Sequence, residues 1–279
     1  MNDPIEDKAE RLREIVRAMG RAIVAYSGGA DSTVLLKFAV ECLGNENVIA
    51  VTAHSPLFPE RERDWAKKMA EILNAKQVIV SLSDPDLEDI MRNDRKRCYY
   101  CKRKIFEKML ELGKKYGIDH VLEGTTVDDE TDYRPGILAK CELGIKSPLY
   151  DAGLRKEEIR EISKRLGLPT HSKPSLSCLA SRFPYGLKIT KQGLEMVEKA
   201  ETYLIGLGFK DVRVRHYTNL ARIEVKEEYL TRFLDPDFRR NLVENLKRLG
   251  YVYVTLDLEG LRSGSMNEEL REERNGRIR

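Results

Sequence analysis

The chain has 279 residues, of which 34% are charged and 41% are hydrophobic, and its formal net charge is +3. This length suits one large domain or two modest ones, and the near balance of charge gives no general electrostatic reason to expect a nucleic-acid-binding protein. No apolar stretch approaches the roughly 18 residues of a membrane-spanning helix. The acidic N-terminal segment lacks the apolar centre of a signal peptide, so we expect a cytoplasmic protein without a membrane segment.

Short apolar strands alternate with helices over the first part of the chain. The predicted strands are residues 22–26, 48–53, 77–81 and 120–124. The predicted helices are residues 7–19, 32–43, 60–73, 86–91, 106–116 and 154–166. This alternation indicates an α/β fold, with a parallel sheet covered by helices on both faces. Ligands of such sheets bind at the carboxyl ends of the strands, so we expect one crevice to collect the loops at 27–32, 54–55 and 124–126.

The pattern changes from about residue 190 onward. Predicted helices at 192–207 and at 228–249, the latter with a break near Pro236, accompany predicted strands at 212–216, 221–225 and 251–258. This α-β-β-α-β order predicts a second, smaller α+β domain, and we divide the chain into domains over 1–185 and 186–279. The strand at 212–216 alternates apolar and basic residues, as a half-exposed strand does. The polar tail, residues 260–279, is expected to be loosely ordered.

A glycine turn stands between the first predicted strand and its helix. It reads Ser27-Gly28-Gly29-Ala30-Asp31-Ser32. Backbone N–H groups at a helix N-terminus attract anions, and the two glycines let the backbone approach one closely. The turn is not a Walker A loop, because an aspartate rather than a lysine precedes the final serine. It resembles the pyrophosphate loop of the PP-loop ATP pyrophosphatases; the alternative is an ordinary strand–turn–helix corner.

Five cysteines are distributed along the chain: Cys42, Cys98, Cys101, Cys141 and Cys178. In a cytosolic protein we expect no structural disulfides, and we interpret Cys42 and Cys141 as small buried hydrophobic residues. The Cys98–Cys101 pair forms a CxxC motif, which by itself is ambiguous among zinc, an iron–sulfur cluster and a redox pair. Basic residues precede it and favour thiolates. Cys178 lies in a predicted loop of small residues and prolines, where it is either functional or incidental to a linker.

Seven segments taken together resemble the LarE family of ATP-dependent sulfur transferases, which help to make the nickel-pincer nucleotide cofactor of lactate racemase. The segments are SGGADS, CYYCK, GTTVDD, SPLYDAGLRKEEIR, SCLASRFPYG, RVRHYTNLARIEV and GYVYVTLDLEGLRSGSMNE, and they run from about residue 10 to residue 268. The late segments are the most specific, because other PP-loop families lack CLASRFPYG and the tail around RSGSMN. A minor departure is Leu261, where the family usually has Tyr or Phe.

The resemblance implies that ATP adenylates a carboxylate of a pyridinium dicarboxylate mononucleotide and that sulfur then displaces AMP to give a thiocarboxylate. The implied ATP-binding residues are Ser27, Gly28, Gly29, Asp31, Ser32, His54 and Gly124. The implied catalytic residues are Cys178, Asp31 and Arg182. Candidate magnesium ligands are Asp31 and the pair Asp128 and Asp129, for which a solvated acidic turn is the alternative. Candidate substrate ligands are Arg213, Arg215 and Glu224.

The sulfur source divides the resembled family into two groups. In one group the loop cysteine gives up its own sulfur and becomes dehydroalanine; in the other, three cysteines hold a [4Fe-4S] cluster with one open iron. This chain has all three cysteines, Cys98, Cys101 and Cys178, which favours the cluster. The family also implies a homo-oligomer, a hexamer. Two alternatives remain: a PP-loop tRNA thiolase, and a non-catalytic adenine-nucleotide sensor.

Overall fold

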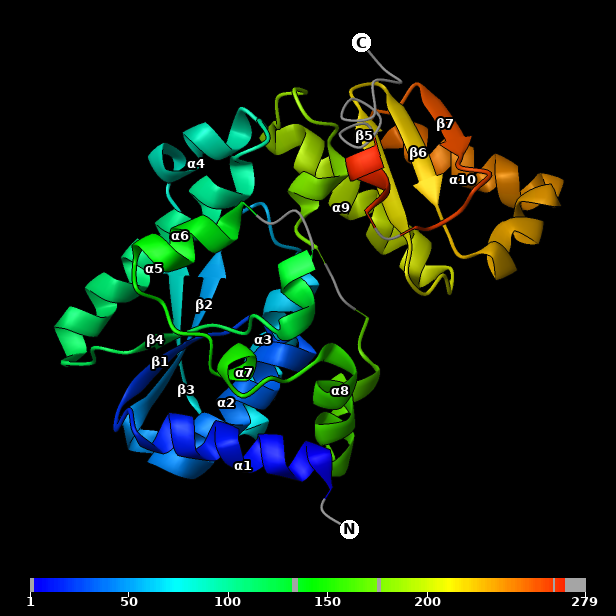
Figure 1. The fold of residues 1–279 in the computed structure, drawn as a ribbon. Coiled ribbons are helices and arrows are strands. Elements are labelled where there is room, and N and C mark those ends of the chain that lie inside the picture. Colours follow the sequence, from blue (N-terminus) through cyan, green and yellow to red (C-terminus); the bar gives the residue numbers. More distant parts are fainter. Residues whose placement is uncertain (1–2, 132–134, 175–176, 263, 269–279) are drawn as a thin grey trace. The chain divides into compact units, whose positions relative to one another are not determined.

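The computed structural model describes residues 3–131, 135–174, 177–262 and 264–268 (Figure 1). The chain divides into two compact units. The first comprises Met1–Ile90 and Arg95–Leu176, and the second comprises Met91–Asp94 and Ser177–Arg279. In this division residues 177–185, which the sequence-based boundary assigns to the first domain, belong to the second unit.

A parallel sheet of the order β3-β2-β1-β4 forms the centre of the first unit. Its strands are β1 (Ala22–Ala25), β2 (Val48–His54), β3 (Lys76–Ser81) and β4 (Val121–Leu122). All three strand pairs are parallel, and Ile23 of β1 lies between Ile49 of β2 and Val121 of β4. The predicted α/β fold with a parallel sheet is therefore confirmed.

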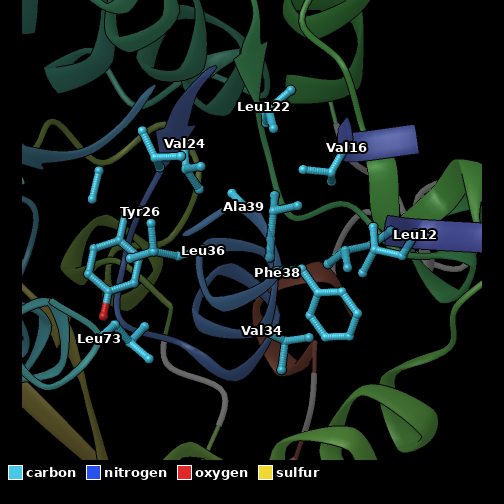
Figure 2. Packing of buried hydrophobic residues seen from close by; sticks show 14 of the residues in the cluster. Leu12, Val16, Val24, Tyr26, Val34, Leu36, Phe38, Ala39, Leu73 and Leu122 are labelled. Atoms are coloured by element: carbon cyan, nitrogen blue, oxygen red, sulfur yellow. The ribbon is translucent and has the colours of Figure 1, made fainter. Parts of the chain in front are cut away.

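Helices cover both faces of this sheet (Figure 1). They are α1 (Pro4–Arg17), α2 (Ala30–Leu43), α3 (Glu60–Ile72), α4 (Asp84–Met91), α5 (Arg97–Tyr116), α6 (Gly136–Glu142), α7 (Pro148–Asp151) and α8 (Lys156–Arg165). Side chains alternate along β1. Val24 therefore belongs to a buried cluster with Phe38 of α2 on one face (Figure 2), and Ile23 belongs to a second cluster with Phe106 of α5 on the other. Burial on both faces explains why β1, Ala-Ile-Val-Ala, is apolar without interruption.

Helix α5 begins at Arg97, whereas the sequence predicts a helix only from residue 106. The segment before Phe106 carries mostly basic and tyrosine side chains and shows little apolar periodicity, but α6 packs against it. Cys98 and Cys101 consequently lie on the first turns of a helix rather than in a loop. The short helices α6 and α7 were not predicted either, because each is too brief to show a helical period.

The second unit contains a three-stranded sheet of the order β5-β6-β7. Its strands are β5 (Arg213–Tyr217), β6 (Leu220–Glu224) and β7 (Tyr253–Leu256), and its long helices are α9 (Lys191–Gly206) and α10 (Pro236–Arg248). The β5–β6 pair is antiparallel and the β6–β7 pair is parallel. Short 3₁₀ segments are η4 (Leu179–Arg182), η5 (Glu227–Leu234) and η6 (Ser265–Asn267). The predicted α-β-β-α-β order and the break at Pro236 are both found.

Two smaller predictions are wrong, and a third is wrong for the part of the tail that the structure describes. Strand β5 is not half-exposed, because the consecutive residues Val214, Arg215 and His216 are all buried. Cys141 is exposed rather than buried. The tail is ordered where it is described: Ser265 and Met266 are both buried, while residues 269–279 lie outside the described residues. In the ranges that the structure covers, we find no helix whose length and apolar character would let it cross a bilayer.

Candidate functional site

The glycine turn connects β1 to the N-terminus of α2, as the sequence predicts. Gly28 has a φ of 73°, and a Cβ built on it would lie 2.9 Å from the Cα of Ala66 on α3. Both the backbone conformation and the close approach therefore require glycine. Gly29 is the N-cap of α2, and no side chain in the described structure caps this helix with a hydrogen bond. The helix N-terminus thus has the geometry of an anion site.

Ser27 and Ser32 hold the turn together. The Oγ atoms of the two residues lie 3.1 Å apart, and the Ser27 N–H donates to the Ser32 Oγ at 3.3 Å. The Gly29 N–H donates to the Ser27 Oγ at 3.4 Å, and the Ser32 hydroxyl donates to the Gly29 carbonyl at 3.3 Å. In the structure these hydroxyls organise the loop backbone itself.

Two further predicted loops follow strands that neighbour β1. Gly124 follows β4, and a Cβ built on it would lie 3.3 Å from the Ser32 backbone nitrogen and 3.4 Å from the Asp31 Cβ. His54 ends β2, and its Nδ1 lies 3.4 Å from Nη1 of Arg63. Since β1, β2 and β4 are parallel neighbours, their carboxyl ends meet at one edge of the sheet. Glycine at position 124 lets the backbone lie directly against the start of α2.

The Asp128–Asp129 pair lies in the same loop region but is engaged with protein groups. Oδ2 of Asp129 accepts the Thr126 N–H at 2.9 Å, and its Oδ1 lies 2.7 Å from Nζ of Lys156. Oδ2 of Asp128 accepts the Lys156 N–H at 2.7 Å, at the start of α8. Asp129 is buried and Asp128 is half-buried, and both are bonded to protein groups, so the turn is not a freely solvated one. Its carboxylates fix the loop after β4 to α8.

A buried carboxylate that the sequence analysis missed stands next to Gly124. Glu123 accepts hydrogen bonds from the Ser147 hydroxyl at 2.5 Å and from the Thr125 hydroxyl at 2.8 Å. The Nζ atoms of Lys102 and Lys140 each lie 3.8 Å from its oxygens. The only sequence signal is an acidic residue at the end of an apolar strand, directly before the glycine.

The two cysteines of the CxxC motif differ from Cys178 in their place in the fold. Cys98 is exposed and Cys101 is half-buried, both on α5 of the first unit. Cys178 is half-buried and belongs to the second unit. Within the described ranges, no three histidine, cysteine or carboxylate side chains are grouped as a metal ion would require.

Arg182 organises the loop that carries Cys178. The guanidinium is 1% exposed and makes a bidentate ion pair with Glu201 of α9, at 2.7 and 3.1 Å. Its Nη1 donates to the hydroxyls of Ser177 and Ser181 at 2.7 and 2.8 Å. The Cys178 carbonyl accepts the Ser181 hydroxyl at 2.8 Å. The arginine therefore fixes the residues on both sides of the cysteine.

Arg215 of β5 makes a second buried ion pair of the same kind. It is bidentate with Glu224 of β6, at 2.9 and 2.7 Å. It also donates to the Ser181 carbonyl at 2.7 Å and to the Ser265 hydroxyl at 2.7 Å. The predicted residues Arg182, Arg215 and Glu224 thus lie in one buried network beside the cysteine loop.

Arg213 differs from the two paired arginines. It is half-buried, and it forms no ion pair with any residue in the described part of the chain. Burial, together with the positive charges of Arg182 and Arg215, lowers the pKa of Arg213 from its ordinary value. Glu224 is already shared by Arg215 and Arg222, whose Nη2 lies 3.2 Å from its Oε1, so an added anion would stabilise the charge on Arg213.

The sequence analysis also missed Glu201, the partner of Arg182. A usable signal was present, since Glu201 lies on the apolar stripe of a predicted helix between Val197 and Leu204. An acidic residue on such a stripe must be paired when it is buried. The sequence shows that a partner is needed, but it does not identify Arg182 as that partner.

Comparison with known proteins gives relatives over nearly the whole chain. Residues 5–100 match the family model described as NAD synthase. The pyridinium-3,5-bisthiocarboxylic acid mononucleotide synthase of Lactiplantibacillus plantarum is 40% identical over 94% of this chain and 95% of its own length. An uncharacterized protein of Synechocystis is 42% identical over 95% of this chain and 99% of its own length. An uncharacterized protein of Methanocaldococcus jannaschii is 32% identical over 87% and 91%.

Proposed function

The chain belongs to the LarE family of PP-loop, ATP-dependent sulfur transferases, and we propose that it converts a carboxylate of a pyridinium dicarboxylate mononucleotide to a thiocarboxylate for a nickel-pincer nucleotide cofactor. The observation that carries this proposal is the glycine turn at the N-terminus of α2, with Gly124 of the neighbouring loop against it. Such a turn suits the pyrophosphate of ATP. The reaction class follows from the relative that is named as a synthase.

The first step is adenylation. Backbone N–H groups of the turn and the positive end of α2 bind the β- and γ-phosphates. A carboxylate oxygen of the substrate attacks the α-phosphorus of ATP, and the bond from that phosphorus to the oxygen that bridges to the β-phosphate breaks. Pyrophosphate leaves, and the substrate becomes an acyl-adenylate. Mg²⁺ neutralises charge on the leaving group when it is bound. Asp31, in the first turn of α2, is the carboxylate proposed to face it, with Asp128 and Asp129 as further candidates.

Arg213 is the residue proposed to bind the anionic substrate. Arg182 and Arg215 are saturated by buried carboxylates and by groups of the cysteine loop, so we assign them to positioning that loop. Arg213 carries a further positive charge near them. A guanidinium of this kind suits a phosphate or a second carboxylate, which it binds through two parallel hydrogen bonds.

The second step delivers sulfur through Cys178. In the sacrificial route its thiolate attacks the acyl carbon and AMP leaves. A base then removes the Cα proton of residue 178, the Cβ–Sγ bond breaks, and its electron pair stays on sulfur. The product is a thiocarboxylate, and dehydroalanine remains in the chain. In the alternative route, which the sequence favours, Cys98, Cys101 and Cys178 would hold a [4Fe-4S] cluster that supplies an exchangeable sulfide.

Two further parts of the proposal concern the cell and the assembly. The five cysteines, all within the described residues, form no disulfide, which suits the reducing cytoplasm. A homo-oligomer is proposed from family membership and is tested by sedimentation at several protein concentrations.

The test of the proposed function is substrate-dependent release of pyrophosphate. We expect the parent protein with ATP, Mg²⁺ and the pyridinium dicarboxylate mononucleotide to form AMP and pyrophosphate. Asp31→Ala should lower the rate by about 100-fold, the usual scale for losing one electrostatic element of a transition state. Asp64→Ala is the matched control, because the Asp64 side chain is 74% exposed on α3.

Three results would contradict the proposal. Asp31→Ala turning over at the parent rate would remove the assignment of the ATP site. Bulk tRNA stimulating AMP formation while the mononucleotide is inert would identify a tRNA thiolase instead, and ATP binding without any pyrophosphate release would identify a nucleotide sensor.

A further inference from the structure

The carbonyl oxygen of Gly28, in the centre of the glycine turn, accepts two hydrogen bonds from outside the turn. The indole Nε1 of Trp65 donates to it at 3.0 Å, and the ammonium Nζ of Lys173 donates to it at 3.3 Å. Trp65 is on α3, and Lys173 follows the 3₁₀ segment η3 (Pro169–Ser172). Both donors belong to the first unit. None of the roles assigned above uses either residue.

The Lys173 side chain is held in one position by three partners. Its Nζ lies 2.7 Å from Oε2 of Glu62, and it stands over the Trp65 ring at 4.8 Å from the ring centroid. The lysine side chain is 13% exposed and the glutamate is 19% exposed. Burial lowers the pKa of Lys173, while Glu62 raises it. A charge that is desolvated and paired in this way indicates a fixed arrangement rather than a mobile surface lysine.

Fixing the Gly28 carbonyl also fixes the neighbouring amide. The peptide unit is planar and trans, so the carbonyl oxygen of Gly28 and the N–H of Gly29 point in opposite directions. The oxygen faces Trp65 and Lys173, whereas the N–H faces the Ser27 Oγ inside the turn, at 3.4 Å. A rotated peptide would present the negative oxygen to an incoming phosphate. Glycine at 28 permits such rotation, because it has no Cβ to oppose it.

We infer that Trp65 and Lys173 are positioning residues for ATP. Together they form a carbonyl clasp, defined as the indole of Trp65, the ammonium of Lys173 and its partner Glu62. The clasp holds the Gly28–Gly29 peptide with its N–H on the inside of the turn, where the phosphates are proposed to bind. This inference rests on the proposed function only in that the turn binds ATP. The ammonium also adds a positive charge behind the anion site, so losing it weakens binding in two ways.

Lys173→Met tests the clasp, because it keeps the aliphatic stem and removes the charged donor. We expect the Kd for ATP to rise by about tenfold, as for loss of one hydrogen bond from a charged group, with kcat within about twofold. The melting temperature should fall, because Glu62 loses its cationic partner, so both constants are measured well below it. Lys173→Arg keeps a positive donor and should restore the Kd to within about threefold of the parent value. Lys164→Met is the matched control, since Lys164 is exposed on α8.

Binding is measured without turnover by the fluorescence of Trp65, which is the single tryptophan of the chain. Because its Nε1 contacts the turn, ATP should change its emission. If ATP changes the emission but the protein releases no pyrophosphate, the inference about the clasp is retained and the proposed reaction is refuted. Failure of the inference and failure of the proposed function are therefore distinguishable.

A double-mutant cycle tests whether the two donors act on one peptide. Trp65→Phe keeps the ring and removes the N–H, and its Kd for ATP is measured by calorimetry. Since both donors hold the same carbonyl, the double variant should lose less affinity than the product of the two single losses. Three results would overturn the inference: an unchanged Kd in Lys173→Met, a Lys173→Arg variant as weak as Lys173→Met with parent-like melting, or strictly multiplicative losses.

Discussion

At the scale of single residues, the second unit is distinguished by two buried arginine–glutamate pairs. The side chains of Arg182 and Arg215 are 1% and 2% exposed, and those of Glu201 and Glu224 are 0% exposed. Removing one partner of such a pair leaves an uncompensated buried charge, which costs more than the pair itself contributes. Both arginines also bond the loop around Cys178, so a lost carboxylate disturbs that loop as well.

Glu201→Gln should therefore destabilise the protein strongly. We expect a loss of about 3 kcal/mol in the free energy of unfolding, because Arg182 would remain buried without a carboxylate and the Val214 N–H would keep only a neutral acceptor. Urea denaturation measures the difference. Glu195→Gln on the same helix is the control, since the Glu195 side chain is 67% exposed, and it should cost less than about 0.5 kcal/mol. Equal effects of the two substitutions would show that the buried pair does not stabilise the fold.

At the scale of elements, His216 of strand β5 contacts Phe183, the residue that follows η4. Its ring lies against Phe183, with centroids 4.7 Å apart, and its Nδ1 lies 3.1 Å from the Tyr251 hydroxyl. Gly193 at the start of α9 leaves room for it, because a Cβ there would lie 3.1 Å from the His216 Nε2. Three separate segments of the second unit thus meet on one imidazole.

The stability of this unit should fall when the pH is lowered below about 6.5. Burial lowers the pKa of His216 from its ordinary value of 6.5. Between the two pKa values the unfolded chain binds a proton that the folded protein does not bind, so acidification favours unfolding. The free energy of unfolding should fall by up to about 1.4 kcal/mol per pH unit until the lower pKa of the folded state is reached. Melting temperatures between pH 7.5 and 5.5 should fall less steeply in His216→Gln than in the parent. His171→Gln is the control, because His171 is exposed. The assignment would be contradicted if the slope of melting temperature against pH were unchanged in His216→Gln but reduced in His171→Gln.

At the scale of the whole molecule, the cysteines are divided between the units. Cys98 and Cys101 belong to the first unit, and Cys178 belongs to the second. Both proposed sulfur routes require Cys178, but only the cluster route requires the CxxC pair.

The sulfur route is decided by intact mass and by three single variants under anaerobic conditions. If the cluster route operates, the mass of the protein is unchanged after one turnover and iron–sulfur absorption is present. The variants Cys98→Ala, Cys101→Ala and Cys178→Ala are then all inactive, because a cluster that has lost one thiolate ligand is lost or labile. Dehydroalanine at position 178, or an active Cys101→Ala variant, would refute the cluster and leave the sacrificial route. Cys42→Ala is the control, because Cys42 is half-buried on α2 and is assigned no part in sulfur transfer.

The sequence by itself determined the alternation of strands and helices, the glycine turn and the family. These depend on patterns within a few neighbouring residues: apolar period, strand–turn–helix order and motif spacing. Tertiary structure decided the rest. Arg215 alternates with apolar residues as an exposed side chain would, yet it is buried because Glu224 and the cysteine loop satisfy its donors. Lys173 meets the Gly28 carbonyl from 145 residues away. Such partners are chosen by how the elements pack, which no local period records, and therefore the residues that position the candidate sites became visible only in the folded chain.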